Sequence, residues 1–302
     1  MLQKAKVWIR AARLRTLPLS IAGIISGNAL SLSNPHFSWS LFGLMMITAM
    51  LFQVVSNFAN DYGDGVKGTD NAQRIGPERV FQAGLLSRAS LKKGIQITSG
   101  LAFLMATILI FLAFGGTSWH YIFLFLGLSV ASIWAAVKYT VGNNAYGYYG
   151  WGDVFVFLFF GGLSVLGASF LQQNSISIDA YLLVLVIGAL SVAVLNLNNM
   201  RDIESDSAVG KRTVAVKLGV GKAKRYHIVL ILGALSGLFL FLFKTQPHYF
   251  WLPLLICIPL GLHLKRVIQN TRPVDFDPEL KIVALSTFAL SVLLFIALYL
   301  SS

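Results

Sequence analysis

Nine apolar segments divide this 302-residue chain, and their lengths limit what it can fold into more than any other feature. Each is close to the roughly 17–25 residues that a helix needs to cross the hydrocarbon core of a bilayer. They lie at 16–33, 39–60, 94–115, 119–137, 153–171, 180–198, 227–243, 249–264 and 282–300. Only 12% of the residues are charged, which is about half the usual fraction in soluble proteins. The sequence therefore predicts an all-α integral membrane protein of about nine transmembrane helices, forming a single domain over residues 1–302.

The first apolar segment follows a basic stretch, as the apolar part of a signal peptide does. No small-residue cleavage site stands out after it, and eight further segments follow, so we expect a retained helix. The single cysteine, Cys257, lies inside an apolar segment. This placement excludes a disulfide framework and a cysteine-rich metal site.

Basic residues are distributed unevenly over the connections between the segments. If the segments cross a membrane in turn, 23 of the 24 Lys and Arg residues fall on one side, and only Lys244 falls on the other. This pattern is typical of cytoplasmic loops, so it predicts an inner-membrane protein with a cytoplasmic N-terminus and an external C-terminus. It also accounts for the formal net charge of +12 without nucleic acid as a partner.

Eleven of the twelve acidic residues lie on the same side, with Asp179 as the exception. Membrane topology does not require this clustering, because Asp and Glu contribute little to orientation. Two motifs hold five of these eleven acids. The first motif is Asn60, Asp61 and Asp64 with Asp70 further on, and the second is Asn198, Asp202 and Asp206.

Asn60-x3-Asp64 and Asn198-x3-Asp202 repeat the same spacing 138 residues apart. Residues four apart share one face of a helix, so each motif presents its oxygen atoms in one direction. The repeat indicates a distant internal duplication. We expect the two halves to face each other across a central cavity whose mouth is cytoplasmic.

Carboxylate and amide oxygens in two facing clusters are ligands that suit Mg²⁺, especially Mg²⁺ shared with substrate phosphates. Basic residues flank both motifs, namely Lys67, Arg74, Arg79, Arg201, Lys211 and Arg212. Carboxylates interleaved with Lys and Arg favour a metal-bound polyphosphate over a bare cation. The competing interpretation is a set of solvated loop charges. A transporter with a duplicated site is a further alternative, although transporter sites lie near the bilayer midplane.

A third segment, 139–153, is polar and rich in glycine and tyrosine, with four residues of each. Tyrosine faces can contact an aromatic substrate and stabilise a carbocation. Asp153, at the start of an apolar segment, is positioned to pair with Lys138 or to orient the substrate. The alternative is that these tyrosines form an interfacial aromatic belt.

Together these features suit a lipid diphosphate as substrate. A metal and basic side chains stabilise a departing diphosphate, and a cavity without water protects the allylic cation until an electron-rich acceptor attacks.

The motifs resemble the paired aspartate-rich motifs of the UbiA superfamily of intramembrane prenyltransferases. The general family pattern places the last acid of the first motif eight residues after the asparagine, where this chain has Gly68. Here Asp70 comes ten residues after Asn60 and is followed by Arg74-Ile75-Gly76-Pro77. That form resembles the subgroup that prenylates naphthoquinone precursors. Other marks of the subgroup are Arg15-Thr16-Leu17-Pro18, Tyr139-Thr140-Val141-Gly142, residues 147–153, residues 195–202, Gly210-Lys211-x-Thr213 and Lys217-Leu218-Gly219.

The resemblance implies nine helices around a central cavity and a requirement for Mg²⁺. It also implies that polyprenyl diphosphate and 1,4-dihydroxy-2-naphthoate are the substrates, with loss of CO2 and formation of demethylmenaquinone. Members that act on 4-hydroxybenzoate, homogentisate or haem share the metal motifs, but the ten-residue spacing and the 139–153 segment argue against them.

The same resemblance implies roles for individual residues. The metal–diphosphate ligands would be Asn60, Asp64, Asn198 and Asp202, with Asp61, Asp70 and Asp206 beside them. Arg74, Arg201 and Lys211 would contact the diphosphate, and Lys67 and Asn143 would be further substrate-binding residues. Asp153, Tyr139 and Tyr148 would face the acceptor, and together with Asp64 and Asp202 they would form the catalytic set.

Overall fold

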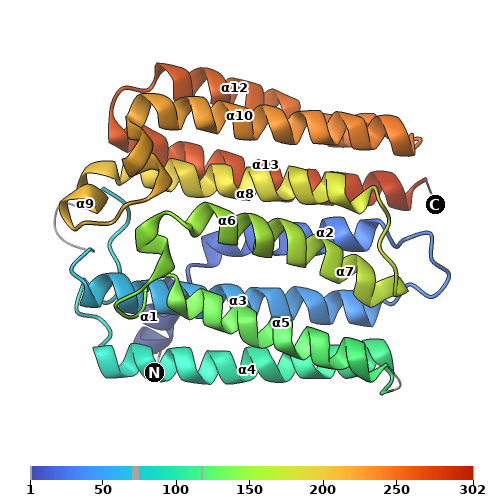
Figure 1. Cartoon of the computed structure of the whole chain (residues 1–302), viewed down its shortest axis with the longest axis horizontal. Helices are drawn as coiled ribbons and strands as arrows, with labels where there is room; N and C mark the ends of the chain where they lie inside the picture. The colour runs from blue at the N-terminus through green and yellow to red at the C-terminus, as the bar shows by residue number, and fades with distance from the viewer. Residues whose placement is uncertain (1, 70–74, 117, 302) are drawn as a thin grey trace.

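The computed structural model describes residues 2–69, 75–116 and 118–301, and these residues form helices and turns with no strand. The main helices run roughly parallel to one long axis (Figure 1). The α-helices are α1 (Leu2–Ala12), α2 (Leu17–Ala29), α3 (Trp39–Val66), α4 (Arg88–Phe114), α5 (Trp119–Lys138), α6 (Gly152–Val156), α7 (Ser164–Gln173), α8 (Ala180–Arg201), α9 (Ile203–Ala208), α10 (Val214–Thr245), α11 (Trp251–Leu254), α12 (Cys257–Gln269) and α13 (Phe276–Tyr299). Short turns of 3-10 helix are η1 (Leu14–Thr16), η2 (Tyr146–Tyr149) and η4 (Pro273–Asp275), and η3 (Phe157–Leu163) is a π-helix.

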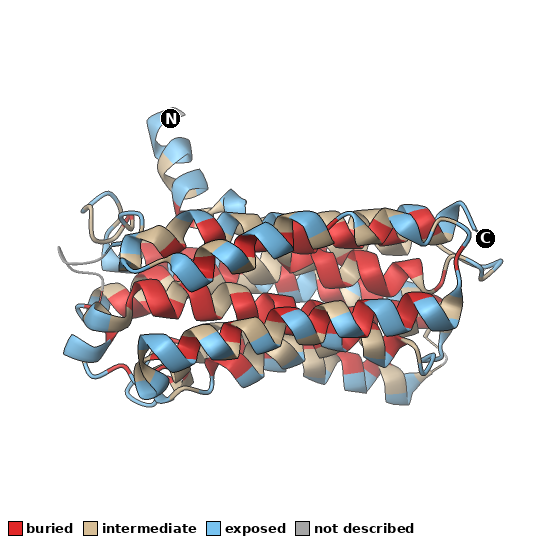
Figure 2. Cartoon of the chain, turned by 90° about the horizontal axis from the view of Figure 1, so that it is seen from above, coloured by how far each residue is buried: buried red, intermediate tan, exposed pale blue. Residues whose placement is uncertain are grey.

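Eight helical segments within the described residues are long and apolar enough to cross a membrane. Three of them join two or more elements: Gly152–Gln173, Trp251–Gln269 and Pro273–Tyr299. Large apolar side chains such as Phe123, Val229 and Phe243 project from the bundle, at 66–75% exposure. Figure 2 shows exposed residues on the outer faces of the helices and buried ones between them. An apolar exterior of this kind requires lipid as its solvent, so the chain is a multi-pass membrane protein.

The first expected segment, 16–33, forms a shorter helix than its apolar run predicts. Helix α2 begins with Pro18 in its first turn and ends at Ala29, because residues 30–33 form turns. Its 13 residues span about 20 Å. It nevertheless packs between α13 and α7 inside the bundle. A buried Asn28 side chain accepts a hydrogen bond from Gln172 of α7 at 2.7 Å and so holds the end of α2 in place.

The connections gather at two opposite ends of the bundle. In Figure 1, α9 and the N-terminus lie near the left end, and the C-terminus lies near the right end. Asn60, Asp61 and Asp64 of the first motif lie near the left end, at the C-terminal end of α3, and the second motif lies there where α8 meets α9. We call this left end of Figure 1 the motif end.

Helix α8 is the most buried of the eight segments, and it packs against α10, α13 and η3. Two glycines permit its closest crossing. A Cβ atom on Gly161 of η3 would lie 2.8 Å from the Cα atom of Gly188 in α8. A π-helical turn inside a longer helix is rare and is often found at functional sites. Here it places Phe159 and Phe160 at the site described below.

We expect Gly161→Ala to destabilise the protein by about 1–3 kcal/mol, because the added methyl group would force the backbones of η3 and α8 apart. The matched control is Gly162→Ala, since a Cβ atom there meets nothing within 4 Å. Thermal unfolding of both variants in detergent measures the difference. Equal midpoints for the two variants would contradict the close crossing.

Candidate active site

Asn60, Asp61 and Asp64 of the first acidic motif lie in the last two turns of α3. Asn60 accepts a hydrogen bond from Thr140 at 3.3 Å, and Thr140 also donates to the carbonyl oxygen of Ala59 at 3.0 Å. Gly63 makes this approach possible, because a Cβ atom there would lie 2.5–2.7 Å from Thr140. The segment after α5 is thus packed directly on the motif.

The second motif spans the junction of α8 and α9. Asp202 interrupts the helix with φ −97° and ψ 15°, yet its N–H donates to the carbonyl oxygen of Asn198 and its own carbonyl oxygen accepts from the N–H of Asp206. Helical spacing is therefore retained across the break. Asn198, Asp202 and Asp206 all line the same cavity, as their spacing predicts.

The two motifs enclose one polar cavity of about 890 Å³. Six of the seven predicted metal-ligating residues line it: Asn60, Asp61, Asp64, Asn198, Asp202 and Asp206. Arg201 and Lys211, two of the predicted substrate-binding residues, line it as well. Asp70 and Arg74 lie outside the described residues. The expectation that the motifs face each other across a cavity is confirmed.

Tyr148 connects the first motif to two basic side chains. Its hydroxyl donates to Asp64 Oδ1 at 2.8 Å and lies 2.5 Å from Thr69 Oγ1. Lys67 Nζ lies 3.8 Å from the centroid of its ring, and Lys211 Nζ lies 5.6 Å from the same centroid. Burial and the neighbouring Asp64 raise the pKa of the Tyr148 hydroxyl, so it is a hydrogen-bond donor at neutral pH.

Asp206 and Lys211 form a buried ion pair at 3.2 Å. Burial disfavours the charge on Lys211, but Asp206 and Asp64 outweigh this effect and raise the lysine pKa. Burial also raises the pKa of Asp206; Lys211 opposes the increase, whereas Asp202 and Asp64 add to it by repulsion. Carboxylates of the two motifs are therefore close enough to repel one another.

The donor set fits a divalent cation that is shared with a substrate. Asp206 Oδ2 is buried and accepts no hydrogen bond from the described residues. Within the same residues, no three Asp, Glu, His or Cys side chains are grouped closely enough to hold a metal by themselves. Mg²⁺ is usually bound through one or two carboxylates together with substrate phosphates. Amide oxygens of Asn60 and Asn198 and oxygens of a phosphate-containing ligand would complete such a site.

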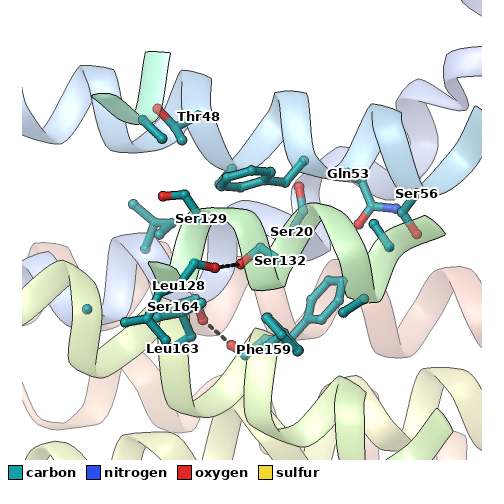
Figure 3. A pocket seen from close by; sticks show the side chains of 18 of the residues that line it. Ser20, Thr48, Gln53, Ser56, Leu128, Ser129, Ser132, Phe159, Leu163 and Ser164 are labelled. Atoms are coloured by element: carbon teal, nitrogen blue, oxygen red, sulfur yellow. Dashed lines mark hydrogen bonds between the residues drawn. The ribbon is translucent and has the colours of Figure 1, made fainter. Parts of the chain in front are cut away.

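A second, apolar cavity of about 340 Å³ adjoins the polar one. Figure 3 shows its walls, with Thr48 and Gln53 on one side and Ser129 and Ser132 on another. The hydroxyl group of Ser132 is satisfied within its own helix by the carbonyl oxygen of Leu128, which leaves the interior largely apolar. The two cavities share six lining residues: Gln53, Asn60, Tyr139, Val156, Phe160 and Leu195.

Tyrosines of the 139–153 segment stand at this shared wall. Tyr139 lines both cavities, and its ring lies 5.4 Å from that of Tyr146, which in turn stacks on Phe155 at 4.0 Å. Burial raises the pKa of the Tyr139 hydroxyl, and Asp64, Asp153 and Asp206 raise it further. Tyr139 is thus neutral and electron-rich where the two cavities meet.

Four predicted residues within the described part of the chain do not line either cavity. Lys67 lies over the ring of Tyr148. Tyr148 reaches the site through Asp64, as described. Asp153 accepts a hydrogen bond from Tyr226 of α10 at 3.0 Å, not from Lys138. Asn143 is exposed in the turn that follows α5. The catalytic role of Asp153 and the substrate-binding role of Asn143 stay predictions.

The structure adds Arg13 and Asp277, which the motifs did not reveal, and it places Arg79, which the sequence had identified only as a flanking basic residue. Arg13 pairs with Asp61 at 3.2 Å, and Arg79 lies 3.9 Å from the same carboxylate oxygen. Asp277, at the start of α13, pairs with Arg201. All three line the polar cavity. Arg13 lies two residues before the Arg15-Thr16-Leu17-Pro18 motif, and this proximity could have identified it as a site residue. Nothing in the sequence linked Asp277 to Arg201.

A membrane-embedded helical bundle with an acid-rich polar cavity against an apolar one defines the class of intramembrane enzymes that bring a charged and a lipid-like group together. Comparison with known proteins identifies the family. Residues 20–284 match the model of the UbiA prenyltransferase family. The chain belongs to this family.

Curated relatives cover nearly the whole chain. The chain is 40% identical to the 1,4-dihydroxy-2-naphthoate octaprenyltransferase of Escherichia coli (strain K12), over 99% of this chain and 97% of that protein. It is 39% identical to the protein of the same name from Haemophilus influenzae, over 96% and 95%. Identity to the corresponding Mycobacterium tuberculosis protein is 30%, over 88% and 87%.

Solved structures share the fold at low sequence identity. A UbiA homolog from Aeropyrum pernix K1 superposes with a TM-score of 0.71 at 14% identity, over 94% of this chain and 98% of that one. A structure of digeranylgeranylglyceryl phosphate synthase gives 0.64 at 16% identity, over 98% and 99%. The all-helical UbiA-like fold expected from the motifs is confirmed.

Proposed function

We propose that the protein transfers a polyprenyl group from polyprenyl diphosphate to 1,4-dihydroxy-2-naphthoate, releasing diphosphate and CO2. The observation that carries the proposal is the wall shared by the acid-rich cavity and the apolar cavity. A prenyl diphosphate has one end suited to each cavity, and its reactive carbon lies between those ends. Full-length identity of 39–40% to two 1,4-dihydroxy-2-naphthoate octaprenyltransferases supports the choice of acceptor.

The reaction breaks the bond between the prenyl carbon and the diphosphate oxygen, and the diphosphate leaves with the electron pair. The ring carbon that bears the carboxylate forms the new carbon–carbon bond. Loss of that carboxylate as CO2 returns its electron pair to the ring. The product is demethylmenaquinone in its reduced, hydroquinone form, so no external oxidant or reductant is needed in this step.

The residues of the polar cavity would bind and orient the diphosphate. The ion pair with Asp206 keeps Lys211 charged, and Lys211 lies beside Tyr148. There it can stabilise the negative charge that develops on the departing diphosphate. We propose Mg²⁺ as the cofactor, held by Asn60, Asp64, Asn198, Asp202 and Asp206. When bound, it would neutralise charge on the leaving diphosphate.

The aromatic side chains at the shared wall would shield the allylic cation. Tyr139 presents an electron-rich ring there, and Phe155 and Phe160 line the adjoining apolar cavity. The small amount of polar surface in that cavity limits competing hydrolysis of the cation. Tyr139 is therefore the residue that we place nearest to the reacting carbon.

We also propose a membrane arrangement. The chain would lie in the inner membrane with α2 as a ninth membrane segment, the motif end and N-terminus in the cytoplasm, and the C-terminus outside. The order of Lys and Arg in the sequence supports this orientation, since 23 of 24 fall on the side of the acidic motifs when the apolar segments cross a membrane in turn. The short α2 fits this arrangement because its ends are continued by η1 and by the turns after Ala29.

The acceptor is tested with purified protein, a polyprenyl diphosphate and Mg²⁺. We expect prenylation of 1,4-dihydroxy-2-naphthoate, detected by mass spectrometry with the stoichiometric release of CO2. Neither 4-hydroxybenzoate nor homogentisate should be converted at a comparable rate. Conversion of 4-hydroxybenzoate but not of the naphthoate would overturn the proposal while leaving the family assignment intact.

A further inference from the structure

Arg201 occupies the oxygen atoms that the second motif would offer to a metal. Its Nε donates to Asp202 Oδ1 at 2.8 Å, and its Nη2 donates to Asp202 Oδ2 at 2.6 Å. The same Nη2 donates to Asn198 Oδ1 at 2.9 Å. A divalent cation that binds these oxygens therefore competes with the guanidinium for all three of them.

Asp277 is the remaining acceptor that the described residues give to this guanidinium. Its Oδ1 pairs with Arg201 Nη1, the nitrogen that makes no bond to the second motif. The Asp277 side chain is about two-fifths exposed and lines the polar cavity, whereas that of Arg201 is 2% exposed. Arg201 released from Asp202 would thus keep one carboxylate partner.

The start of α13 is anchored independently of the site. Glu279, two residues after Asp277, is buried and accepts a hydrogen bond from His263 Nδ1 at 2.6 Å. It also pairs with Arg266 at 2.5 Å, and both partners belong to α12. Asp277 therefore extends from a fixed point of the bundle, so it can retain the guanidinium when the other contacts are lost.

We propose that Asp277 is a positioning residue for Arg201, which holds the guanidinium aside when a metal–diphosphate complex takes Asn198 and Asp202. Without Asp277, the displaced Arg201 would lose its remaining carboxylate partner and would depend on the diphosphate alone for compensation beside a divalent cation. Removal of a carboxylate partner from a buried cation is strongly unfavourable. Asp277 consequently determines how readily the second motif accepts a divalent cation, an inference that rests on the proposed function.

The test measures metal binding directly in Asp277→Asn. Mn²⁺ serves as the probe, and the free ion is followed by electron paramagnetic resonance with inorganic diphosphate present. We expect affinity to fall by about tenfold or more, as when residues that support metal ligands are replaced, and Asp277→Glu to restore most of it. The matched control is Asp275→Asn, because the ion-pair partner of Asp275 among the described residues is the exposed Arg272 on the same turn. Affinity should be unchanged in that control.

A second measurement separates positioning from a general loss of structure. If Asp277 acts through Arg201, then Asp277→Asn should have no further effect on Mn²⁺ affinity in an Arg201→Met background. Unchanged Mn²⁺ affinity in a folded Asp277→Asn protein, or additive effects in the double variant, would overturn the inference. If the wild-type protein itself bound no Mn²⁺ with diphosphate, or prenylated no naphthoate, the proposed function would fail instead.

Discussion

Asp64→Asn is expected to reduce Mg²⁺-dependent prenyl transfer by roughly 10²–10³-fold, equivalent to about 3–4 kcal/mol of lost transition-state stabilisation. Asp64 lines the polar cavity and accepts the hydroxyl hydrogen bond of Tyr148. Asparagine has the same shape and its oxygen can still accept that bond, so the fold should survive. The negative charge that would hold a metal is what disappears.

Initial rates at increasing Mg²⁺ concentration measure this effect, together with thermal unfolding in detergent. Asp179→Asn is the control, because Asp179 pairs with Lys244 at the opposite end of the bundle and touches neither cavity. That variant should keep wild-type activity. Wild-type turnover by a folded Asp64→Asn protein would remove Asp64 from the proposed metal ligands.

Lys211→Met is expected to lower both stability and activity. Removing one partner of a buried ion pair typically costs about 3–5 kcal/mol, because the other charge is left without compensation. Here the uncompensated group would be Asp206, which already experiences repulsion from Asp202 and Asp64. The midpoint of thermal unfolding should fall clearly, and turnover should fall with it because a cation is lost from the diphosphate site.

Two comparisons make the Lys211 result specific. Lys222→Met removes an exposed lysine from α10 and should leave the unfolding midpoint unchanged. The double variant Asp206→Asn with Lys211→Met removes both charges and should recover part of the lost stability, without recovering activity. A Lys211→Met protein as stable as the wild type would show that the pair is not buried in the membrane-embedded protein.

The lengths of the apolar runs and the spacing of polar residues predicted those features that are determined by residues close together in the sequence. Eight of the nine apolar runs became helices long enough to cross a membrane. Helical spacing placed Asn198, Asp202 and Asp206 toward one cavity even though Asp202 interrupts the helix. The repeated Asn-x3-Asp motif was sufficient to predict that two distant helices contribute to one site.

Features that depend on distant segments escaped prediction. Hydropathy counted residues 30–33 as part of a span, but the chain turns after Ala29, where the Asn28 and Gln172 side chains meet. Asp61 was predicted as a metal neighbour, and the structure shows it between Arg13 and Arg79. The pairing of Arg201 with Asp277 joins residues 76 apart in sequence, and no periodicity within one helix encodes such a contact.

The polar contacts of Asn28 have a consequence for the membrane as an insulator. At the end of the bundle remote from the acidic motifs, Gln172 bridges Asn28 and the backbone of Ser38, and the Asn28 amide also reaches the sulfur of Met45, which lines the apolar cavity. These groups hydrogen-bond to one another, so few of their donors and acceptors are left to hold a chain of water molecules. Because their hydrogen bonds are used within the protein, Asn28 and Gln172 provide no row of free polar groups between the apolar cavity and this end of the bundle, and this disfavours a leak of ions or protons along it.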